Sequence, residues 1–292
     1  MINICLYGRP TTNMGQLTGL LLNHPDVKLH SVVAVGKEGC RLDATFAGLV
    51  GATDLIVSEQ PDYEQIDLIF TDQPLANVPE NVKTVGYHTD CLHDSTLTYG
   101  LPEMGRRRIV TDCTRAVVPS PEAMATLLAL LPLGKNLMLN QSIDVQITTP
   151  AQVDTTQILN ELHSALRTVQ NSFNAQINIT LNHTDNPRQA AANVSIPVST
   201  SAELLAELYN NAYANHHFTY LINHIPQHFE VENTNSCLLA IEQTDSRHIT
   251  LHAALDRQLK GSAGTAIHLM NLMFGFYECV GLELKGTGQP IP

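Results

Sequence analysis

A short β-type run leads directly into a long apolar segment in the middle of the chain. The run is Ala116-Val117-Val118, and the apolar segment extends from Met124 to Leu133. A strand that feeds directly into a helix is typical of an α/β fold, and it places the N–H groups and the positive dipole end of the helix at one edge of the sheet. Such an edge favours anion chemistry. This junction therefore constrains both the fold class and the place of a site.

The residues between this strand and this helix form a good helix start. Ser120 suits the N-cap, Pro121 the first helical position and Glu122 the first turn. Pro121 donates no N–H, and Glu122 brings a negative charge to the place where an anionic intermediate would form. The local sequence therefore predicts a helix cap rather than a catalyst.

The N-terminal part of the chain alternates strand and helix patterns. A β-run from Ile2 to Tyr7 ends at Gly8, and a helical pattern covers residues 15–23. Further short strands are predicted at residues 29–35, 68–70 and 82–85. A strand, a turn and a helix in this order are typical of the opening of a dinucleotide-binding domain.

The composition changes beyond Pro132. Strands are predicted at residues 143–147, 176–181, 193–198, 237–242 and 249–255, and helices at residues 155–170 and 202–214. Two-residue alternation is typical of strands with one buried face. The pattern predicts an α+β domain with an antiparallel or mixed sheet.

The composition narrows the class of protein. The 292 residues carry a net charge of −12, and no Lys/Arg cluster is longer than Arg106-Arg107-Arg108, so nucleic-acid binding is not expected. No apolar run approaches the ~20 residues of a membrane span, and no signal peptide precedes the first strand. The 6 cysteines form no Cys-x-x-Cys pair, which favours reduced thiols. We expect a cytoplasmic protein that binds neither nucleic acid nor a membrane.

Four segments resemble a known family. They are Tyr99-Gly100-Leu101-Pro102-Glu103, the helix end Leu127–Leu133, the run Asp256–Gly264 and the run Met270–Gly275. With residues 15–27 they make the chain resemble the N-acetyl-gamma-glutamyl-phosphate reductase family, which is related to aspartate-semialdehyde dehydrogenase. The resemblance implies a Rossmann-like doubly wound parallel sheet in residues 1–119 with 262–292, and an α+β domain of the substrate and dimerisation type in residues 120–261. It also implies an NADP-dependent oxidoreductase of arginine biosynthesis that assembles as a homo-oligomer and reduces an acyl phosphate.

This sequence departs from the family pattern at the catalytic positions. The family's cysteine nucleophile falls on Ser120 or Pro121, depending on the side from which the alignment is anchored. The family's histidine positions, one of them the catalytic base, fall on Gln152 and Asp154, and one substrate loop is absent. Covalent catalysis of this kind needs an activated nucleophile and a positioned base together.

The nucleotide loop departs from the pattern as well. Two of the three glycines of the family's loop become Thr11 and Met14, and we expect the Met14 side chain to obstruct a backbone approach to a pyrophosphate. The loop is either reshaped, binding NADP through Arg9 and the threonine hydroxyls, or a turn that no longer binds NADP. The candidate cofactor-binding residues are Gly8, Arg9, Thr11, Thr12, Asn13, Gly15, Lys37, Gly264 and Asn271.

Two functional hypotheses remain. The first is a non-catalytic paralogue that keeps the fold and the self-association surface, and that binds a small molecule or an active paralogue. The second is a working NAD(P)H-dependent acyl-phosphate or semialdehyde oxidoreductase with a rearranged site that uses Ser120 or Cys113. The histidines at 216, 217, 224 and 228 cluster in sequence but lack cysteine or carboxylate partners at ligand spacing, so no metal site is expected.

Overall fold

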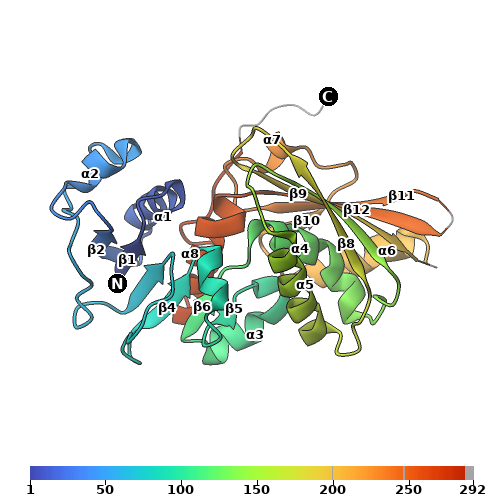
Figure 1. Ribbon diagram of the computed structural model, residues 1–292, viewed down its shortest axis with the longest axis horizontal. Helices are drawn as coiled ribbons and strands as arrows, with labels where there is room; N and C mark the ends of the chain where they lie inside the picture. The colour runs from blue at the N-terminus through green and yellow to red at the C-terminus, as the bar shows by residue number, and fades with distance from the viewer. Residues whose placement is uncertain (199, 246, 287–292) are drawn as a thin grey trace. The chain divides into compact units, whose positions relative to one another are not determined.

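The computed structural model describes residues 1–198, 200–245 and 247–286. The chain divides into two compact units, Met1–Pro119 with Ser262–Glu283, and Ser120–Gly261 with residues 284–286. The sequence predicts that residues 262–292 belong with the first domain, and of these residues 287–292 lie outside the described part of the chain. Figure 1 shows the order of the elements along the chain.

The first unit is built on a parallel sheet of 6 strands in the order β2-β1-β3-β4-β6-β5. Its strands are β1 (Ile2–Gly8), β2 (Val27–Ala34), β3 (Leu68–Thr71), β4 (Lys83–Gly86), β5 (Thr98–Tyr99) and β6 (Arg115–Val117). Its helices are α1 (Thr12–Leu22), α2 (Leu42–Thr45), α3 (Pro102–Asp112) and α8 (Gly264–Phe274), with 3-10 turns η1 (Ala47–Leu49) and η2 (Thr89–His93). β2 pairs with one edge of β1, and β3 pairs with its other edge. Because the strand order reverses there, the carboxyl ends of β1 and β3 form the switch point where such sheets bind ligands.

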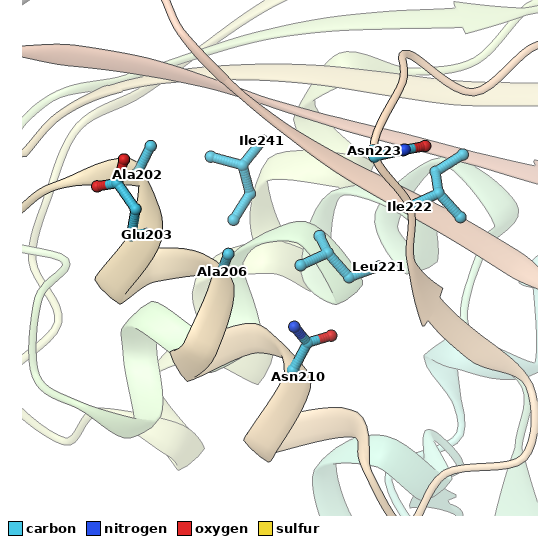
Figure 2. A pocket seen from close by; sticks show the side chains of 8 residues that line it. All are labelled: Ala202, Glu203, Ala206, Asn210, Leu221, Ile222, Asn223 and Ile241. Carbon is cyan, nitrogen blue, oxygen red and sulfur yellow. The ribbon is translucent and has the colours of Figure 1, made fainter.

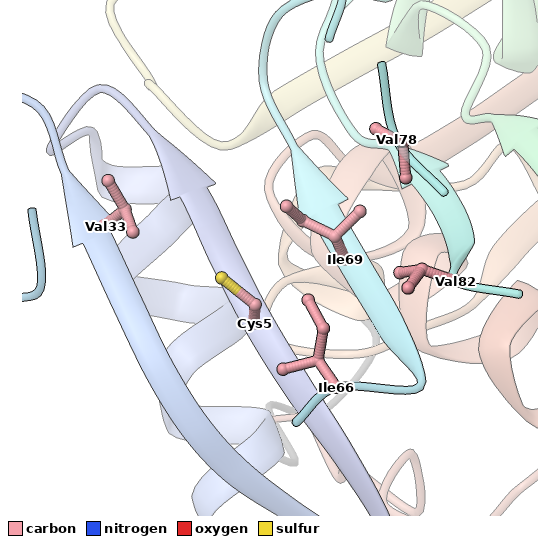
Figure 3. Packing of buried hydrophobic residues seen from close by; sticks show 6 residues of the cluster. All are labelled: Cys5, Val33, Ile66, Ile69, Val78 and Val82. Atoms are coloured by element: carbon pink, nitrogen blue, oxygen red, sulfur yellow. The ribbon is translucent and has the colours of Figure 1, made fainter. Parts of the chain in front are cut away.

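Part of the core of the first unit depends on residues from the connections. Cys5, Val33 and Ile69 from three neighbouring strands pack with Ile66, Val78 and Val82 (Figure 3). The last three come from segments outside the strands, including the stretch between β3 and β4, for which the structure shows coil rather than helix. Burial of these side chains fixes the connections onto the sheet.

The second unit contains a mixed sheet of 6 strands in the order β10-β11-β12-β9-β7-β8. The strands are β7 (Ile143–Thr149), β8 (Ile177–His183), β9 (Gln189–Pro197), β10 (Thr219–Leu221), β11 (Cys237–Gln243) and β12 (His248–Asp256). The helices are α4 (Pro121–Lys135), α5 (Thr155–Val169), α6 (Ala202–Tyr213) and α7 (His228–Val231), and a π-helical turn (η3) spans Leu259–Ala263. The pairs β7–β9, β9–β12 and β11–β12 are antiparallel, whereas β7–β8 and β10–β11 are parallel. The mixed sheet matches the prediction from the alternating runs.

Helix α4 is the centre of the second unit. It is buried along almost its whole length and packs on β9 and β12 beside α5. Pro132 lies inside it and has no N–H, so the carbonyl of Leu128 lacks its usual partner in the helix. The hydroxyl of Tyr213 from α6 donates to that carbonyl, and the hydroxyl of Tyr209 donates to the carbonyl of Ala129. Helix α6 therefore repairs the gap that the proline makes.

The sequence missed several short elements and one long one. Helix α3 follows directly from the Pro102-Glu103 segment, and its interior contains a kink at Gly105 with φ −138° and ψ 31°. This helix contains three consecutive arginines and little apolar periodicity, so a search for a hydrophobic repeat does not predict it. Among the described residues, no helix is both long enough and apolar enough to cross a membrane.

Candidate functional site

The start of α4 has the cap that the local sequence predicts. Ser120 is the N-cap, with φ −60° and ψ 142°, and its Oγ accepts a hydrogen bond from the N–H of Ala123 at 3.3 Å. Pro121 is the first helical residue, and a Cβ placed on Gly261 would lie 2.9 Å from the Cβ of Pro121. The π-helical turn thus lies against the proline ring and fills the space beside it.

A residue that the sequence analysis missed completes this helix start. Glu161 of α5 accepts the N–H of Ser120 at its Oε1 (3.0 Å) and the Ser120 hydroxyl at its Oε2 (2.6 Å). An anion does sit at the N-terminus of α4, but it is the protein's own carboxylate. The one available sequence signal is that Glu161 falls on the apolar stripe of α5, three residues after Ile158 and beside Leu162, both of which are buried.

The carboxylate of Glu122 points into the second unit. It is 1% exposed, and it accepts hydrogen bonds from Thr149 Oγ1 at 2.6 Å and from Arg257 Nε at 3.3 Å. The charge that Glu122 was expected to bring to the helix start is thus paired with Arg257 inside the second unit.

The resemblance maps the family's histidine positions onto Gln152 and Asp154. Gln152 and Asp154 are exposed, and Asp154 caps α5 by accepting the N–H of Thr156 at 2.8 Å. The Ser120 hydroxyl donates a hydrogen bond to Glu161 of α5, the helix that Asp154 caps. Neither a carboxamide nor an exposed carboxylate exchanges protons well near pH 7.

Cys113, the other candidate nucleophile, lies between α3 and β6 in the first unit. Its thiol is buried and donates to the carbonyl of Arg115 at 3.2 Å. Burial raises the pKa of the Cys113 thiol, which is the opposite of the activation that a nucleophilic cysteine requires.

The nucleotide edge of the first unit is organised by an ion-pair network. Asp72 follows β3 and is 1% exposed, and its Oδ2 accepts both Nε of Arg9 (2.8 Å) and the N–H of Arg9 (3.1 Å). Arg9 Nη2 reaches Asp90 Oδ2 at 2.8 Å. The hydrogen bond that Arg9 donates to Asp72 raises the pKa of the Arg9 guanidinium, so Arg9 is charged. The loop after β1 is thereby fixed across the switch point.

Gly8 serves this network. Its φ is +150°, and a Cβ on it would lie 2.2 Å from Asp72 Oδ1. The residue must therefore be glycine to let the Asp72 carboxylate approach the end of β1.

The other residues of the loop form the beginning of α1. Thr11 caps the helix by accepting the N–H of Met14, Thr12 and Asn13 follow in the first turn, and Gly15 faces the ring of Phe46. Met14 is 0% exposed. The expectation that its side chain obstructs the approach to a phosphate is wrong, because the side chain is turned into the core and leaves the loop surface.

The remaining cofactor candidates do not join the loop. Lys37 is exposed in a turn after β2, and Gly264 is buried at the start of α8. Asn271 is buried, and its Nδ2 donates to the carbonyls of Glu278 (3.1 Å) and Val280 (2.9 Å) while its Oδ1 lies 3.0 Å from His24 Nε2. The Asn271 amide is thus fully used in holding the turn after α8.

The histidines of the second unit that lie close together in sequence do not form a group of metal ligands among the described residues. His224 pairs with Glu230 at 2.7 Å, and His228 lies in α7 with its pKa lowered by burial. Over the described ranges of the chain, the structure contains no group of three or more His, Cys, Asp or Glu side chains that could hold a metal ion.

A separate groove of about 440 Å³ lies beside α6 (Figure 2). Ala202, Ala206 and Asn210 form its helical wall, and Leu221 and Ile241 from β10 and β11 form the other wall. Its lining residues include no cysteine, serine, histidine or lysine. The one ionisable side chain of the lining is the exposed carboxylate of Glu203, so the groove lacks the pair of nucleophile and base that covalent catalysis needs.

The chain is similar in sequence to proteins named N-acetyl-gamma-glutamyl-phosphate reductase. The relative from Parabacteroides distasonis is 32% identical over 324 residues, with 98% of this chain and 99% of the relative covered. The chain belongs to the N-acetyl-gamma-glutamyl-phosphate reductase family. The relative from Phocaeicola vulgatus is 31% identical over 322 residues, with the same coverage. No protein-family model matches the chain.

The alignments are longer than the chain of this reductase-family member. Because they extend over 324 and 322 residues while the chain has 292, the relatives contain segments with no counterpart here.

Solved structures agree with the fold. Aspartate semialdehyde dehydrogenase II from Vibrio cholerae, complexed with ASA, gives a TM-score of 0.73 at 14% identity and covers 95% of this chain and 99% of that one. The aspartate semialdehyde dehydrogenase with NADP from Candida albicans gives 0.71 at 10% identity, covering 94% and 98%. The predicted family resemblance and the predicted fold class, a Rossmann-like sheet with an α+β domain, are thus confirmed.

Proposed function

We propose that this chain is a non-catalytic member of its reductase family, with a binding or partner role. The observation that carries the proposal is the start of α4, where Ser120 gives both its N–H and its hydroxyl to Glu161. The family resemblance places a cysteine nucleophile at Ser120 or at Pro121.

The chemistry of this helix start supports the proposal. A thiolate at a helix N-terminus is stabilised by the dipole and by free N–H groups, but here the N–H of Ser120 is bound to the Glu161 carboxylate. The Ser120 hydroxyl also accepts the N–H of Ala123, so one of its lone pairs is already engaged. With Gln152 and Asp154 at the histidine positions, the nucleophile and the base are lost together, and such losses are not repaired singly.

The same proposal includes weak binding of NADP or none. At the switch point, two carboxylates, Asp72 and Asp90, surround the single guanidinium of Arg9. A diphosphate placed there would meet one more negative than positive charge, and like charges 4 Å apart cost about 4 kcal/mol at an effective dielectric constant of 20. To bind the diphosphate, Arg9 would have to give up its ion pair with Asp72. The Asp72 carboxylate, which is 1% exposed, would then have no counter-charge from Arg9.

The partner role rests on the sheet of the second unit. Helices α4, α5 and α6 lie on one face of it (Figure 1), and α4 contacts both of the others. Along β7, Asp144 and Gln146 alternate with buried residues and are exposed, and Asn193 and Ser195 on β9 are partly exposed. Under this proposal, which follows the family resemblance, another chain covers this polar face, either a second copy or an active paralogue.

A second candidate function has one specific observation in its favour. The 2.6 Å hydrogen bond from the Ser120 hydroxyl to Glu161 has the geometry of a nucleophile and its base. Under this alternative the chain is an NAD(P)H-dependent oxidoreductase that acts on an acyl phosphate or a semialdehyde through Ser120.

One experiment separates the two candidates. Purified protein is titrated with NADPH by nucleotide fluorescence and then assayed in the phosphate-dependent reverse direction, beside Ser120→Ala and an active family member as the positive control. The non-catalytic proposal expects no saturable NADPH binding below millimolar concentration and no turnover in either variant. Wild-type turnover of roughly one per second or more that Ser120→Ala abolishes would establish the second candidate instead.

A further inference from the structure

Among the described residues, two neighbouring arginines of α3 lack an acidic partner, although the protein is acidic. Five of the 10 arginines have an ion-pair partner: Arg9 with Asp72 and Asp90, Arg41 with Asp43 and Asp54, Arg106 with Glu278, Arg188 with Asp256 and Arg257 with Glu122. Arg115 and Arg167 donate to backbone carbonyls. Arg107 and Arg108 are exposed and have neither kind of partner among the residues that the structure describes. The chain has a net charge of −12, so two adjacent guanidinium groups without an acidic partner are opposite in sign to the protein as a whole.

These two side chains line a pocket of about 390 Å³. The pocket lies at the kink of α3, where Met104, Arg107, Arg108 and Thr111 share one face of the helix, with Gly105 and Asp112 beside them. A Cβ on Gly105 would meet nothing within 4 Å, so the kink leaves open space next to the guanidinium groups. The pocket is open to solvent, so it suits a charged ligand bound at the surface of α3.

The charges of the pocket favour an anion. Arg106 also lines it, and Glu278 holds the Arg106 guanidinium in place through two hydrogen bonds. Asp112 is the acidic residue of the lining, and its carboxylate accepts the hydroxyl of Thr111 at 2.7 Å. With Arg106 neutralised by Glu278, the guanidinium groups of Arg107 and Arg108 outweigh Asp112 by one positive charge.

We propose that this pocket binds a small molecule with two or more oxyanion groups, such as a diphosphate or a polycarboxylate. Guanidinium groups bind phosphate and carboxylate oxygens in pairs of parallel hydrogen bonds, and they lose less hydration than an ammonium group does. Because Arg107 and Arg108 both line the pocket, each guanidinium group can bind a different oxyanion group of one ligand. The site belongs to the first unit and is independent of the chemistry at α4 and of the NADP loop.

The test measures the binding of two probes, pyrophosphate and citrate, by calorimetry at constant ionic strength. Saturable binding of one or both to the wild type is expected, and the stronger probe identifies the ligand as phosphate-like or carboxylate-like. Arg107→Gln and Arg108→Gln each remove one charge-assisted contact and should weaken binding about tenfold or more. Glutamine keeps the helix propensity of the position, so both variants should fold.

Two further variants distinguish a pocket from diffuse attraction. Gly105→Leu keeps every charge and fills the open space at the kink, and it should weaken binding at least as much as either arginine change. Arg247→Gln removes an exposed arginine without an ion-pair partner elsewhere in the described chain, and it should leave the affinity unchanged. Far-UV circular dichroism checks that each variant is folded.

Three results would each overturn the proposal. The first is no saturable binding of either probe to the wild type at up to about 10 mM, the weak end of specific affinity. The second is equal weakening by Arg247→Gln and by the changes at 107 and 108. The third is unchanged binding by Gly105→Leu, which would mean that the surface charge attracts the probe without a site.

Discussion

Replacing Tyr213 with phenylalanine should destabilise this protein more than the same change at Tyr209. Both side chains are buried, at 6% and 1% exposure, and each hydroxyl donates to a carbonyl of α4. The two carbonyls differ in what remains after the change. The Ala129 carbonyl keeps the N–H of Leu133 within the helix, but the Leu128 carbonyl has no helix partner because residue 132 is proline.

The expected magnitudes follow from this difference. Tyr209→Phe removes one of two hydrogen bonds from a satisfied carbonyl and should cost about 1 kcal/mol. Tyr213→Phe leaves a buried carbonyl without a partner and should cost about 2–3 kcal/mol. For a chain of this size the second change should lower Tm by about 4–10 °C.

A double-mutant cycle with Pro132→Ala isolates the cause. Alanine restores the N–H at position 132, which can donate to the Leu128 carbonyl, so Tyr213→Phe should then cost about as little as Tyr209→Phe. Unfolding is followed by far-UV circular dichroism because the chain has no tryptophan. If Tyr213→Phe costs the same in the wild-type and Pro132→Ala backgrounds, the tyrosine does not replace the missing helix bond and the reasoning is refuted.

Three other predictions concern the site, an ion pair and assembly. Pro121→Cys should stay below roughly one NADPH turnover per second with an acyl phosphate, because Glu161 occupies the helix start and the base is missing; ordinary turnover would contradict the non-catalytic proposal. Burial acts to raise the pKa of Glu278, but hydrogen bonds from His268 and Arg106 outweigh it and lower the pKa to about 2. This carboxylate should therefore add about 2 kcal/mol of stability above pH 4.5 that is lost as the pH falls toward 2, and in acid titrations Glu278→Gln should remove that slope; an unchanged slope would rule out its role. Sedimentation should show self-association at micromolar concentration, and a clean monomer would count against the partner role of the second sheet.

The parts of the fold that could be predicted depend on residues close together in the chain. The cap at Ser120 involves Ala123, three residues away, and the strands other than the short β5 and β10 follow from two-residue alternation or from short apolar runs. Helix α3 was missed because its sequence, with Arg106-Arg107-Arg108 after Gly105, lacks an apolar period, and its position is set by packing against α8.

The sequence by itself determined the family and the α/β and α+β character of the two units, and it predicted that the family's cysteine and histidine positions fall on Ser120 or Pro121 and on Gln152 and Asp154. Only the tertiary structure decided which side chains bind the residues at the candidate sites. Glu161 reaches Ser120 across 41 residues, and Arg9 reaches Asp72 and Asp90 across 63 and 81 residues. Met14 was expected at the loop surface and lies in the core because helix α1 begins at Thr12 and turns that side chain inward. The physical reason is that a cap or a strand period is set by backbone geometry within one turn. The partner of a charged side chain depends instead on which distant segment packing brings within hydrogen-bond reach.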